Sequence, residues 1–315
     1  MLKGRNLIFM MAVIFMLVLM FGNVLAATED IAVIVKTNNS SFWQVVNKGA
    51  QDAAKELGIT ITYDGPAAET DINGQVSLVE NAINRKVKGI VLAPCDPNAL
   101  VKVAEKAKQQ KIALIGIDSA LNTKCDSFLT TNNVAAGQKA AQELIKRAGK
   151  SGKVALMLYV AGAGSCVDRA KGFTDEIKAK TKMKIIGPYY SDADSAKALN
   201  QMTDVLAAHP DLKAVFAANE PTAIGVGKAI ADSGKAGKIV AIGFDGAPIL
   251  QDYVKKGVYQ GIMVQSPYNM GYLGVKTAWD KINGKPIKEF IDTGVFAVTT
   301  ENINTDEAQK ALGNK

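Results

Sequence analysis

Cysteine and histidine are scarce in this chain of 315 residues, which has three cysteines and one histidine. Cys95, Cys125 and Cys166 show no CxxC spacing, and His209 stands before Pro210 at a predicted helix end. Structural zinc sites take four cysteine or histidine ligands, so we expect no metal site. A serine or cysteine nucleophile would also have no evident histidine base.

Motifs for nucleotides and cofactors are missing as well. The chain has no GxxxxGK[ST] phosphate loop and no GxSxG nucleophile elbow. Gly162-Ala163-Gly164 lacks the third glycine of a dinucleotide-binding loop. The lysines are scattered along predicted helices, so the formal net charge of +7 indicates a solvated basic surface and not a nucleic-acid partner. We therefore expect no cofactor.

The first informative segment that the chain does contain is an export signal. Lys3 and Arg5 precede an apolar run over residues 7–21, and the small residue Ala26 closes the segment. This order is typical of a secretory signal peptide, which we place at residues 1–26. An uncleaved anchor stays open, because the run approaches the roughly 17 to 25 residues of a spanning helix. No cysteine directly follows the run for lipid attachment, so we expect a soluble periplasmic protein.

Cysteine pairing stays open at this stage. In an oxidising compartment an odd number of cysteines leaves at least one thiol unpaired. We favour Cys95 with Cys125 only because both fall in the first half of the chain.

Short aliphatic runs alternate with segments of helical periodicity, which predicts parallel sheets with crossover helices. The predicted strands are Ile31–Val35, Ile59–Tyr63, Gly89–Ala93, Ala113–Ile117 and Phe128–Thr130, followed by Val154–Tyr159, Met183–Ile186, Ala214–Ala217, Ile239–Phe244 and Tyr259–Val264. The rhythm restarts after residues 149–152, so we expect two α/β units of similar size. No flexible linker separates them, which favours apposed halves with a cleft between them.

The first predicted helix carries two adjacent aromatic residues. Ser41 and Gln44 predict a capping box at its start, and Gly58 stands where a left-handed C-cap belongs. Phe42 and Trp43 point about 100° apart on a helix, so they cannot both face one core. We expect one of them to flank the cleft, because an aromatic face covers the apolar surface of a sugar ring.

Polar side chains follow most of the predicted strands, at the sheet edge where parallel α/β folds bind ligands. They are Lys36, Asp96, Asp118, Asn219, Asp245 and Gln265, with Arg169 slightly further on. Asp96 before Pro97 is most simply a helix cap, and Arg169 could pair with Asp168. Together these side chains supply the donors and acceptors that a polyhydroxylated ligand needs.

Six short motifs follow one another along the chain. They are Lys-Thr-x-x-x-x-Phe-Trp at 36–43, Phe-x-Thr-Thr-x-Asn at 128–133, Arg-x-x-Gly-Phe at 169–173, Ala-Val-Phe-Ala-x-Asn at 214–219, Gly-Phe-Asp-Gly at 243–246 and Gln-x-Pro at 265–267. In order and spacing the set resembles the type I periplasmic sugar-binding proteins of ABC transporters, specifically the ribose- and allose-binding group. The likeness covers essentially all of the chain after residue 26.

The resemblance implies two Rossmann-like lobes joined by three hinge crossings, near residues 132–133, 264–265 and 292–294. Residues 27–132 with 265–292 would form the N-terminal lobe, and residues 133–264 with 293–315 the C-terminal lobe. A ligand that touches both lobes shifts the open–closed equilibrium toward the closed form, which a membrane permease would recognise. The implied partners are a small sugar and an ABC permease; a chemoreceptor stays open, and we expect a monomer.

Carried over position by position, the resemblance also implies a ligand site. Lys36 matches the allose-type members, whereas Ser119 stands where ribose-type proteins have an arginine and Ala193 where they have an aromatic. These differences remove a bidentate donor and a stacking surface, so a hexose, a polyol or a related furanose stays open on equal terms with ribose. The implied site residues are Lys36, Phe42, Trp43, Asp118, Ser119, Arg169, Asn219, Asp245 and Gln265.

The resulting prediction is a periplasmic solute-binding protein that captures a monosaccharide, whether hexose, pentose or polyol, and delivers it to an ABC importer. A binding protein for a furanose-like signalling molecule stays open, because Lys36 and the Asp118-Ser119 pair also suit such a ligand. An exported sugar hydrolase is a weaker alternative, since Asp118 and Asp245 alone do not demonstrate paired-carboxylate chemistry. We expect a protein that is not an enzyme.

Overall fold

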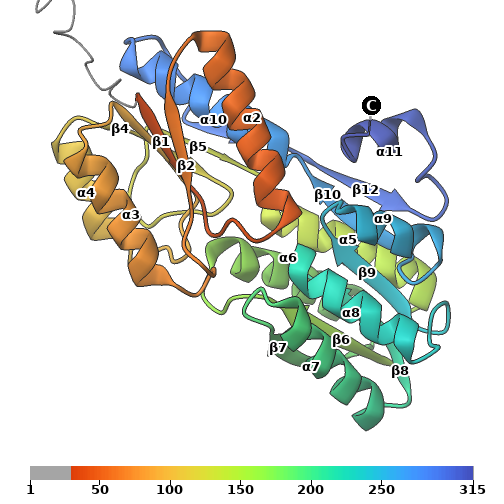
Figure 1. Ribbon diagram of the computed structural model, residues 1–315. Helices are drawn as coiled ribbons and strands as arrows, with labels where there is room; N and C mark the ends of the chain where they lie inside the picture. The colour runs from red at the N-terminus through yellow and green to blue at the C-terminus, as the bar shows by residue number, and fades with distance from the viewer. Residues whose placement is uncertain (1–29, 315) are drawn as a thin grey trace, which may run out of the picture.

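The computed structural model describes residues 30–314 and shows two α/β lobes, each built on a six-stranded sheet (Figure 1). The predicted fold class, two lobes with mostly parallel sheets, is confirmed. The predicted signal peptide, residues 1–26, lies outside the described residues. Among the residues that are described, no helix is both long and apolar enough to cross a membrane.

The N-terminal lobe has an all-parallel sheet with helices on both faces. Its strands are β1 (Ile31–Ile34), β2 (Ile61–Asp64), β3 (Gly89–Leu92), β4 (Ala113–Ile117), β5 (Ser127–Thr130) and β11 (Phe290–Asp292), in the order β11-β5-β4-β3-β1-β2. Its helices are α2 (Ser41–Leu57), α3 (Ile72–Asn84), α4 (Val101–Gln109) and α10 (Pro267–Ile282). Successive residues of β1 point to opposite faces, so Val33 packs with α2 and α10 while Ile34 packs with α3 and α4.

The C-terminal lobe repeats this plan with one antiparallel edge strand. Its strands are β6 (Lys153–Leu158), β7 (Lys184–Tyr190), β8 (Leu212–Ala217), β9 (Val240–Phe244), β10 (Gly261–Gln265) and β12 (Val295–Thr299), in the order β12-β10-β9-β8-β6-β7 with β12 antiparallel to β10. Helices α5 (Asn133–Ala148) and α6 (Gly164–Lys180) cover one face, and α7 (Ser195–Ala208), α8 (Glu220–Asp232) and α9 (Pro248–Lys255) the other. Helix α11 (Asp306–Ala311) follows β12.

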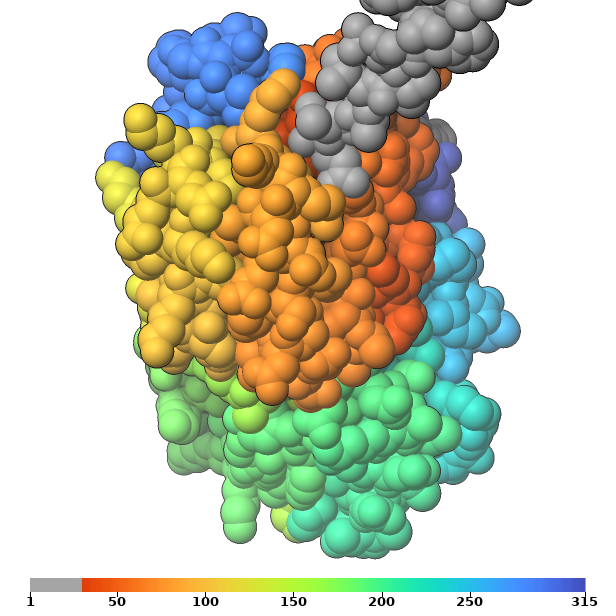
Figure 2. Space-filling model, turned by 60° about the vertical axis from the view of Figure 1, so that its left-hand side comes forward, coloured from red at the N-terminus to blue at the C-terminus, as the bar shows by residue number. Residues whose placement is uncertain are grey.

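The chain passes between the two sheets at three places. Residues 131–132 join β5 to α5, Ser266 joins β10 to α10, and residues 293–294 join β11 to β12. Two of these crossings touch, because Thr131 Oγ1 donates to the carbonyl of Gly294 at 3.2 Å. In Figure 2 the orange and yellow atoms of the N-terminal lobe meet the green atoms of the C-terminal lobe along a front across the molecule, so the lobes are closed on each other.

The start of α2 differs from the prediction by one residue. Ser40 is the N-cap, and its hydroxyl accepts from the N–H of Trp43, while the side chain of Gln44 bonds elsewhere. The predicted Ser41–Gln44 capping box is therefore wrong, because two adjacent serines offer the same cap and the backbone uses the first. The predicted left-handed C-cap is confirmed, with φ of 66° at Gly58.

Asp96 also has a different local role from the predicted helix cap. Its Oδ1 accepts from the N–H groups of Asn98 and Ala99, in a turn that precedes α4. The N-cap position of α4 is Leu100, which makes no side-chain cap bond. The prediction was wrong because four residues, 97–100, separate Asp96 from the first residue of α4.

Several strand limits shift as well. The second strand begins at Ile61, two residues later than predicted, and β7 continues to Tyr190, four residues beyond the predicted end. Strands β11 and β12 and helix α11 were not predicted. Phe290 of β11 is 54% exposed, and the strand is three residues long, so it carries no run of buried apolar residues to reveal it.

The three cysteines are all free thiols, which overturns the favoured Cys95–Cys125 pair. Cys95 follows β3 and points at the carbonyl of Lys36, whereas Cys125 lies before β5 against Gly116. Two cysteines in the same half of the chain need not lie close together in the folded sheet. Burial raises the pKa of Cys95 to about 12, so its thiol stays protonated at neutral pH.

Candidate ligand-binding site

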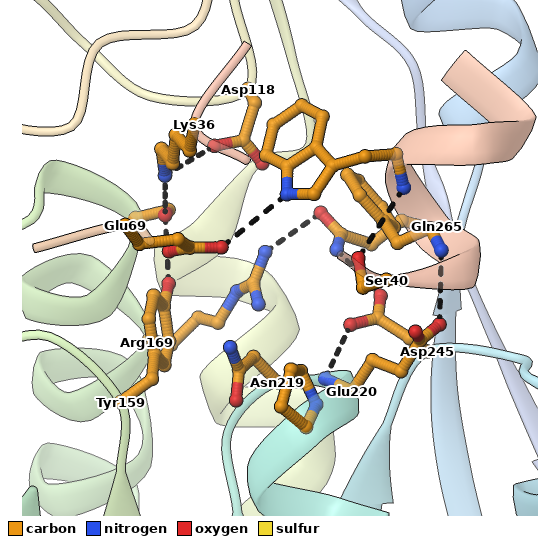
Figure 3. Close-up of a pocket in the computed structure, with 14 residues that line it drawn as sticks. Lys36, Ser40, Glu69, Asp118, Tyr159, Arg169, Asn219, Glu220, Asp245 and Gln265 are labelled. Carbon is orange, nitrogen blue, oxygen red and sulfur yellow. Dashed lines mark hydrogen bonds and ion pairs between the residues drawn. The ribbon is translucent and has the colours of Figure 1, made fainter. Parts of the chain in front are cut away.

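A cavity lies between the lobes, at the carboxyl ends of the strands of both sheets (Figure 3). Every predicted site residue lines it except Ser119. The N-terminal lobe provides Lys36, Ser40, Phe42, Trp43, Glu69 and Asp118, and the C-terminal lobe provides Tyr159, Ser165, Arg169, Asn219, Glu220, Pro221 and Asp245, with Gln265 at the end of β10. No cluster of three or more side chains placed to hold a metal ion occurs in residues 30–314.

In the N-terminal lobe, the cavity holds a buried ion pair. Lys36 follows β1 and Asp118 follows β4, and their Nζ and Oδ2 atoms are 2.6 Å apart. Burial alone would raise the pKa of Asp118, but the nearby Lys36 and Arg169 charges hold it below its usual value. Burial likewise opposes the charge of Lys36, yet the carboxylates of Asp118 and Glu69 raise its pKa. Both members of the pair are therefore charged at neutral pH.

Ser119 lies behind this pair and links it to the other lobe. Lys36 Nζ donates to Ser119 Oγ at 2.6 Å, and Ser119 Oγ lies 2.8 Å from Ser165 Oγ in the C-terminal lobe. The hydroxyl of Tyr159 is 2.7 Å from the same Ser165 oxygen. Ser119 thus takes part in a bridge between the lobes at one end of the cavity.

In the C-terminal lobe, Arg169 is held by neutral acceptors. Its guanidinium donates to Asn133 Oδ1 at 2.8 Å, to the carbonyl of Ala218 at 2.8 Å and to Gln265 Oε1 at 2.7 Å. It also lies over the ring of Phe244, 3.8 Å from the centroid. The alternative of a pair with neighbouring Asp168 is wrong, because Arg169 points inward and is 2% exposed.

Asp245 is the second buried carboxyl group of the cavity. It follows β9 with φ of 75°, a strained conformation for a residue with a side chain. Gln265 Nε2 donates to its Oδ1 at 2.7 Å, and the backbone N–H of Glu220 donates to its Oδ2 at 2.9 Å. Burial raises its pKa to about 7, although the charge of Arg169 opposes the increase. Figure 3 shows Gln265 placed between Arg169 and Asp245.

Both aromatic residues of α2 line the cavity, whereas the helical spacing predicted only one. The ring centroids of Phe42 and Trp43 are 4.9 Å apart, and the ring planes are nearly perpendicular at 88°. Both side chains border the cavity because the two residues occupy the first turn of α2, and this end of the helix faces the cleft. Trp43 Nε1 donates to Glu69 Oε1 at 3.3 Å, which satisfies the indole N–H.

The comparison with known families adds independent information. Residues 31–286 match the family model of the periplasmic binding protein domain. The chain belongs to this family.

Two named relatives of this binding protein are similar over most of its length. The D-allose-binding periplasmic protein of Escherichia coli K12 is 33% identical over 271 residues, which cover 83% of this chain and 87% of the relative. The ribose import binding protein of Bacillus subtilis is 32% identical over 262 residues, with coverage of 83% and 84%.

Two solved solute-binding proteins of transporters have the same fold as this periplasmic binding protein. One, from Agrobacterium vitis and solved with bound D-fucose, is 54% identical with a TM-score of 0.87, covering 89% of this chain and 98% of the other. A second, from Agrobacterium radiobacter in complex with D-arabinose, is 38% identical with a TM-score of 0.87, covering 90% and 98%.

Some cavity residues of this binding protein were not predicted. Glu220 directly follows Asn219, so examining one further residue after β8 would have found it. Tyr159 and Ser165 lie on either side of the loop at residues 162–164, which the sequence suggested only as a weak dinucleotide-binding motif. Glu69 lies in the loop before α3, two residues ahead of the Asp71 N-cap, and no strand end marks it.

Proposed function

We propose that this periplasmic binding protein captures a monosaccharide in its pyranose form between the two lobes and delivers it to an ABC importer. The observation that carries the proposal is the combination of two perpendicular aromatic rings with fixed polar groups from both lobes around one small space. Aromatic faces cover the apolar surface of a sugar ring while its hydroxyls bond at the edge. Residues 1–26 would act as a cleaved signal that places the protein in the periplasm.

The hydrogen bonds within the protein leave several groups free for sugar hydroxyls. Asn219 uses its Oδ1 to cap α8, which leaves its amide nitrogen to donate. Arg169 uses three of its five N–H groups, which leaves two. Asp118 is bonded through Oδ2, so its Oδ1 is placed to accept. The cavity thus offers both free donors and a free acceptor, as hydroxyl groups require.

D-Fucose is our first candidate among the monosaccharides. The support is the Agrobacterium vitis protein, which was solved with D-fucose and is 54% identical to this chain. The departures from the ribose-type pattern at Lys36 and Ser119 also favour a ligand other than ribose.

A calorimetric titration of the purified protein tests this function. The panel should contain D-fucose, D-allose, D-arabinose, D-ribose and a hexitol. We expect saturable binding of at least one aldose with one site per chain, and weaker binding of D-ribose. Absence of binding for every member of the panel would contradict the proposal.

A further inference from the structure

Glu220 joins the two lobes through hydrogen bonds at the opposite end of the cavity from Ser119. It is the first residue of α8 in the C-terminal lobe and is 3% exposed. Its Oε1 accepts from the N–H of Ser41 at 2.9 Å, and its Oε2 accepts from the Ser41 hydroxyl at 2.8 Å and from the N–H of Phe42 at 3.1 Å. All three donors belong to the N-terminal lobe, so separation of the lobes breaks these bonds.

The three donors lie at the start of α2, whose first turn has no acidic side chain. Ser41 and Phe42 are the first two residues of α2, and their N–H groups have no partner within the helix. Ser40 caps only the N–H of Trp43, and the first turn of α2 contains no acidic residue. A carboxylate at this position satisfies the free N–H groups and interacts favourably with the helix dipole. Glu220 therefore caps α2 from across the cleft.

The cap is also connected to the cavity. The backbone N–H of Glu220 donates to Asp245 Oδ2 at 2.9 Å. The carboxylate of Glu220 accepts from the N–H of Phe42, and Phe42 forms a wall of the cavity. A movement of the lobes therefore changes the cap and the surroundings of the ligand together.

We propose that Glu220 is a positioning residue, an interlobe latch that stabilises the closed form and slows release of the bound sugar. The latch rests on the proposed function, because closure matters for release only if the cavity encloses a ligand. Glu220 also lines the cavity, so a direct contact with the sugar is the alternative that the experiment must separate.

A double-mutant cycle between Glu220 and Ser41 makes this separation. Ser41→Pro removes both the N–H and the hydroxyl donor of Ser41. Proline is tolerated at the first position of a helix, and Ser40 before it already has the extended backbone that proline requires. Ser41→Pro keeps the bond from the Phe42 N–H, so it loses only part of what Glu220→Ala loses. If Glu220 acts through α2, the double variant therefore loses little more than Glu220→Ala alone.

The measured quantities are the affinity for D-fucose and its release rate, followed by stopped-flow fluorescence. We expect Glu220→Ala to weaken binding about tenfold, mainly through faster release, and Ser41→Pro to have a smaller effect in the same direction. The double variant should resemble Glu220→Ala, and Glu80→Ala, at an exposed position of α3, should bind as the wild type does. Fully additive losses, or an unchanged release rate in Glu220→Ala, would overturn the latch.

Two controls keep the latch and the proposed function distinguishable. The melting temperature of the ligand-free variants should stay within a few degrees of the wild type, since each lobe has hydrophobic cores of its own. If the wild type binds no sugar, the proposed function fails and the latch is judged by solution scattering of the ligand-free proteins. Glu220→Ala should then show the larger radius of gyration, and an equal radius would overturn the latch.

Discussion

Asp118 and Asp245 occupy equivalent positions in the two lobes, yet their electrostatic surroundings are opposite. Each follows a strand, each has positive φ, and they are 4% and 5% exposed. Asp118 contacts the Lys36 ammonium at 2.6 Å, and its pKa is held low. Among residues 30–314, the Asp245 carboxyl accepts hydrogen bonds only from the amide of Gln265 and a backbone N–H, and burial raises its pKa to about 7. The N-terminal lobe therefore places a cation directly beside its buried aspartate, whereas the C-terminal lobe gives its aspartate neutral hydrogen-bond donors.

The largest expected effect comes from breaking the compensated pair. Lys36→Met leaves Asp118 buried without its partner and should lower the free energy of unfolding by about 3 to 5 kcal/mol. Urea denaturation of the ligand-free protein measures this loss. The double variant Lys36→Met/Asp118→Leu is the matched control and should recover most of the stability. Equal stability of Lys36→Met and the wild type would remove the contrast between the lobes.

The equivalent change in the other lobe should affect binding and not folding. Asp245→Ala is expected to weaken sugar binding at least about 100-fold, because it removes an acceptor for hydroxyl groups and frees the Gln265 amide. The melting temperature of the ligand-free protein should change by only a few degrees. Calorimetric titration and a thermal melt check both expectations, and collapse of the fold would assign Asp245 a structural role instead.

The pH dependence of stability should have opposite signs at the two carboxyl groups. The folded protein binds a proton at Asp245 more tightly than the unfolded chain does, because its pKa is raised to about 7. The contribution of Asp245 to the free energy of unfolding therefore decreases between about pH 4 and pH 7. Asp118, with its lowered pKa, contributes at neutral pH and loses that contribution as the pH falls below its ordinary value of 3.8.

Urea denaturation at pH 5 and pH 7 tests this difference. The wild type should lose stability over this interval relative to Asp245→Asn, which has no titrating group at this position. Parallel pH profiles of the two proteins would show that the pKa of Asp245 is not raised in the folded state.

The smallest expected effect concerns the bridge at Ser165. Ser165→Ala removes one hydroxyl shared by Ser119 and Tyr159 and should weaken sugar binding by a factor of about three to ten. The Lys36–Asp118 pair remains intact in this variant, so its stability should stay close to that of the wild type. A loss of stability comparable to that of Lys36→Met would mean that the hydroxyl bridge, and not the ion pair, stabilises this end of the cavity.

The sequence predicted the parts of the site that follow a general rule of parallel sheets. Lys36, Asp118 and Asp245 each follow a buried strand, and continuous apolar runs make such strands easy to recognise. Glu69 was not predictable in this way, because its place in the cavity depends on how the loop before α3 folds over Trp43. Whether the side chains of Phe42 and Trp43 face the cavity depends on where the end of α2 lies relative to the cleft. The spacing of residues along the helix does not reveal this position.

The fold shows the same difference between features set by neighbouring residues and features set by contacts distant in the chain. The order of strands and helices and the cap at Gly58 are local properties, and they were predicted. Strand β11 depends on pairing with β5 across more than 150 residues of chain, and its exposed Phe290 gives no local signal. The free thiol of Cys95 likewise follows from the strand order, which spacing along the chain does not reveal.

A crystal structure of the protein with its bound monosaccharide tests the central claim most directly. The account predicts one sugar ring between Phe42 and Trp43 and the C-terminal lobe, with hydroxyl groups bonded both to Asp118 and to Asp245 or Arg169. A sugar that contacts one lobe only, or that binds outside this cavity, would contradict it.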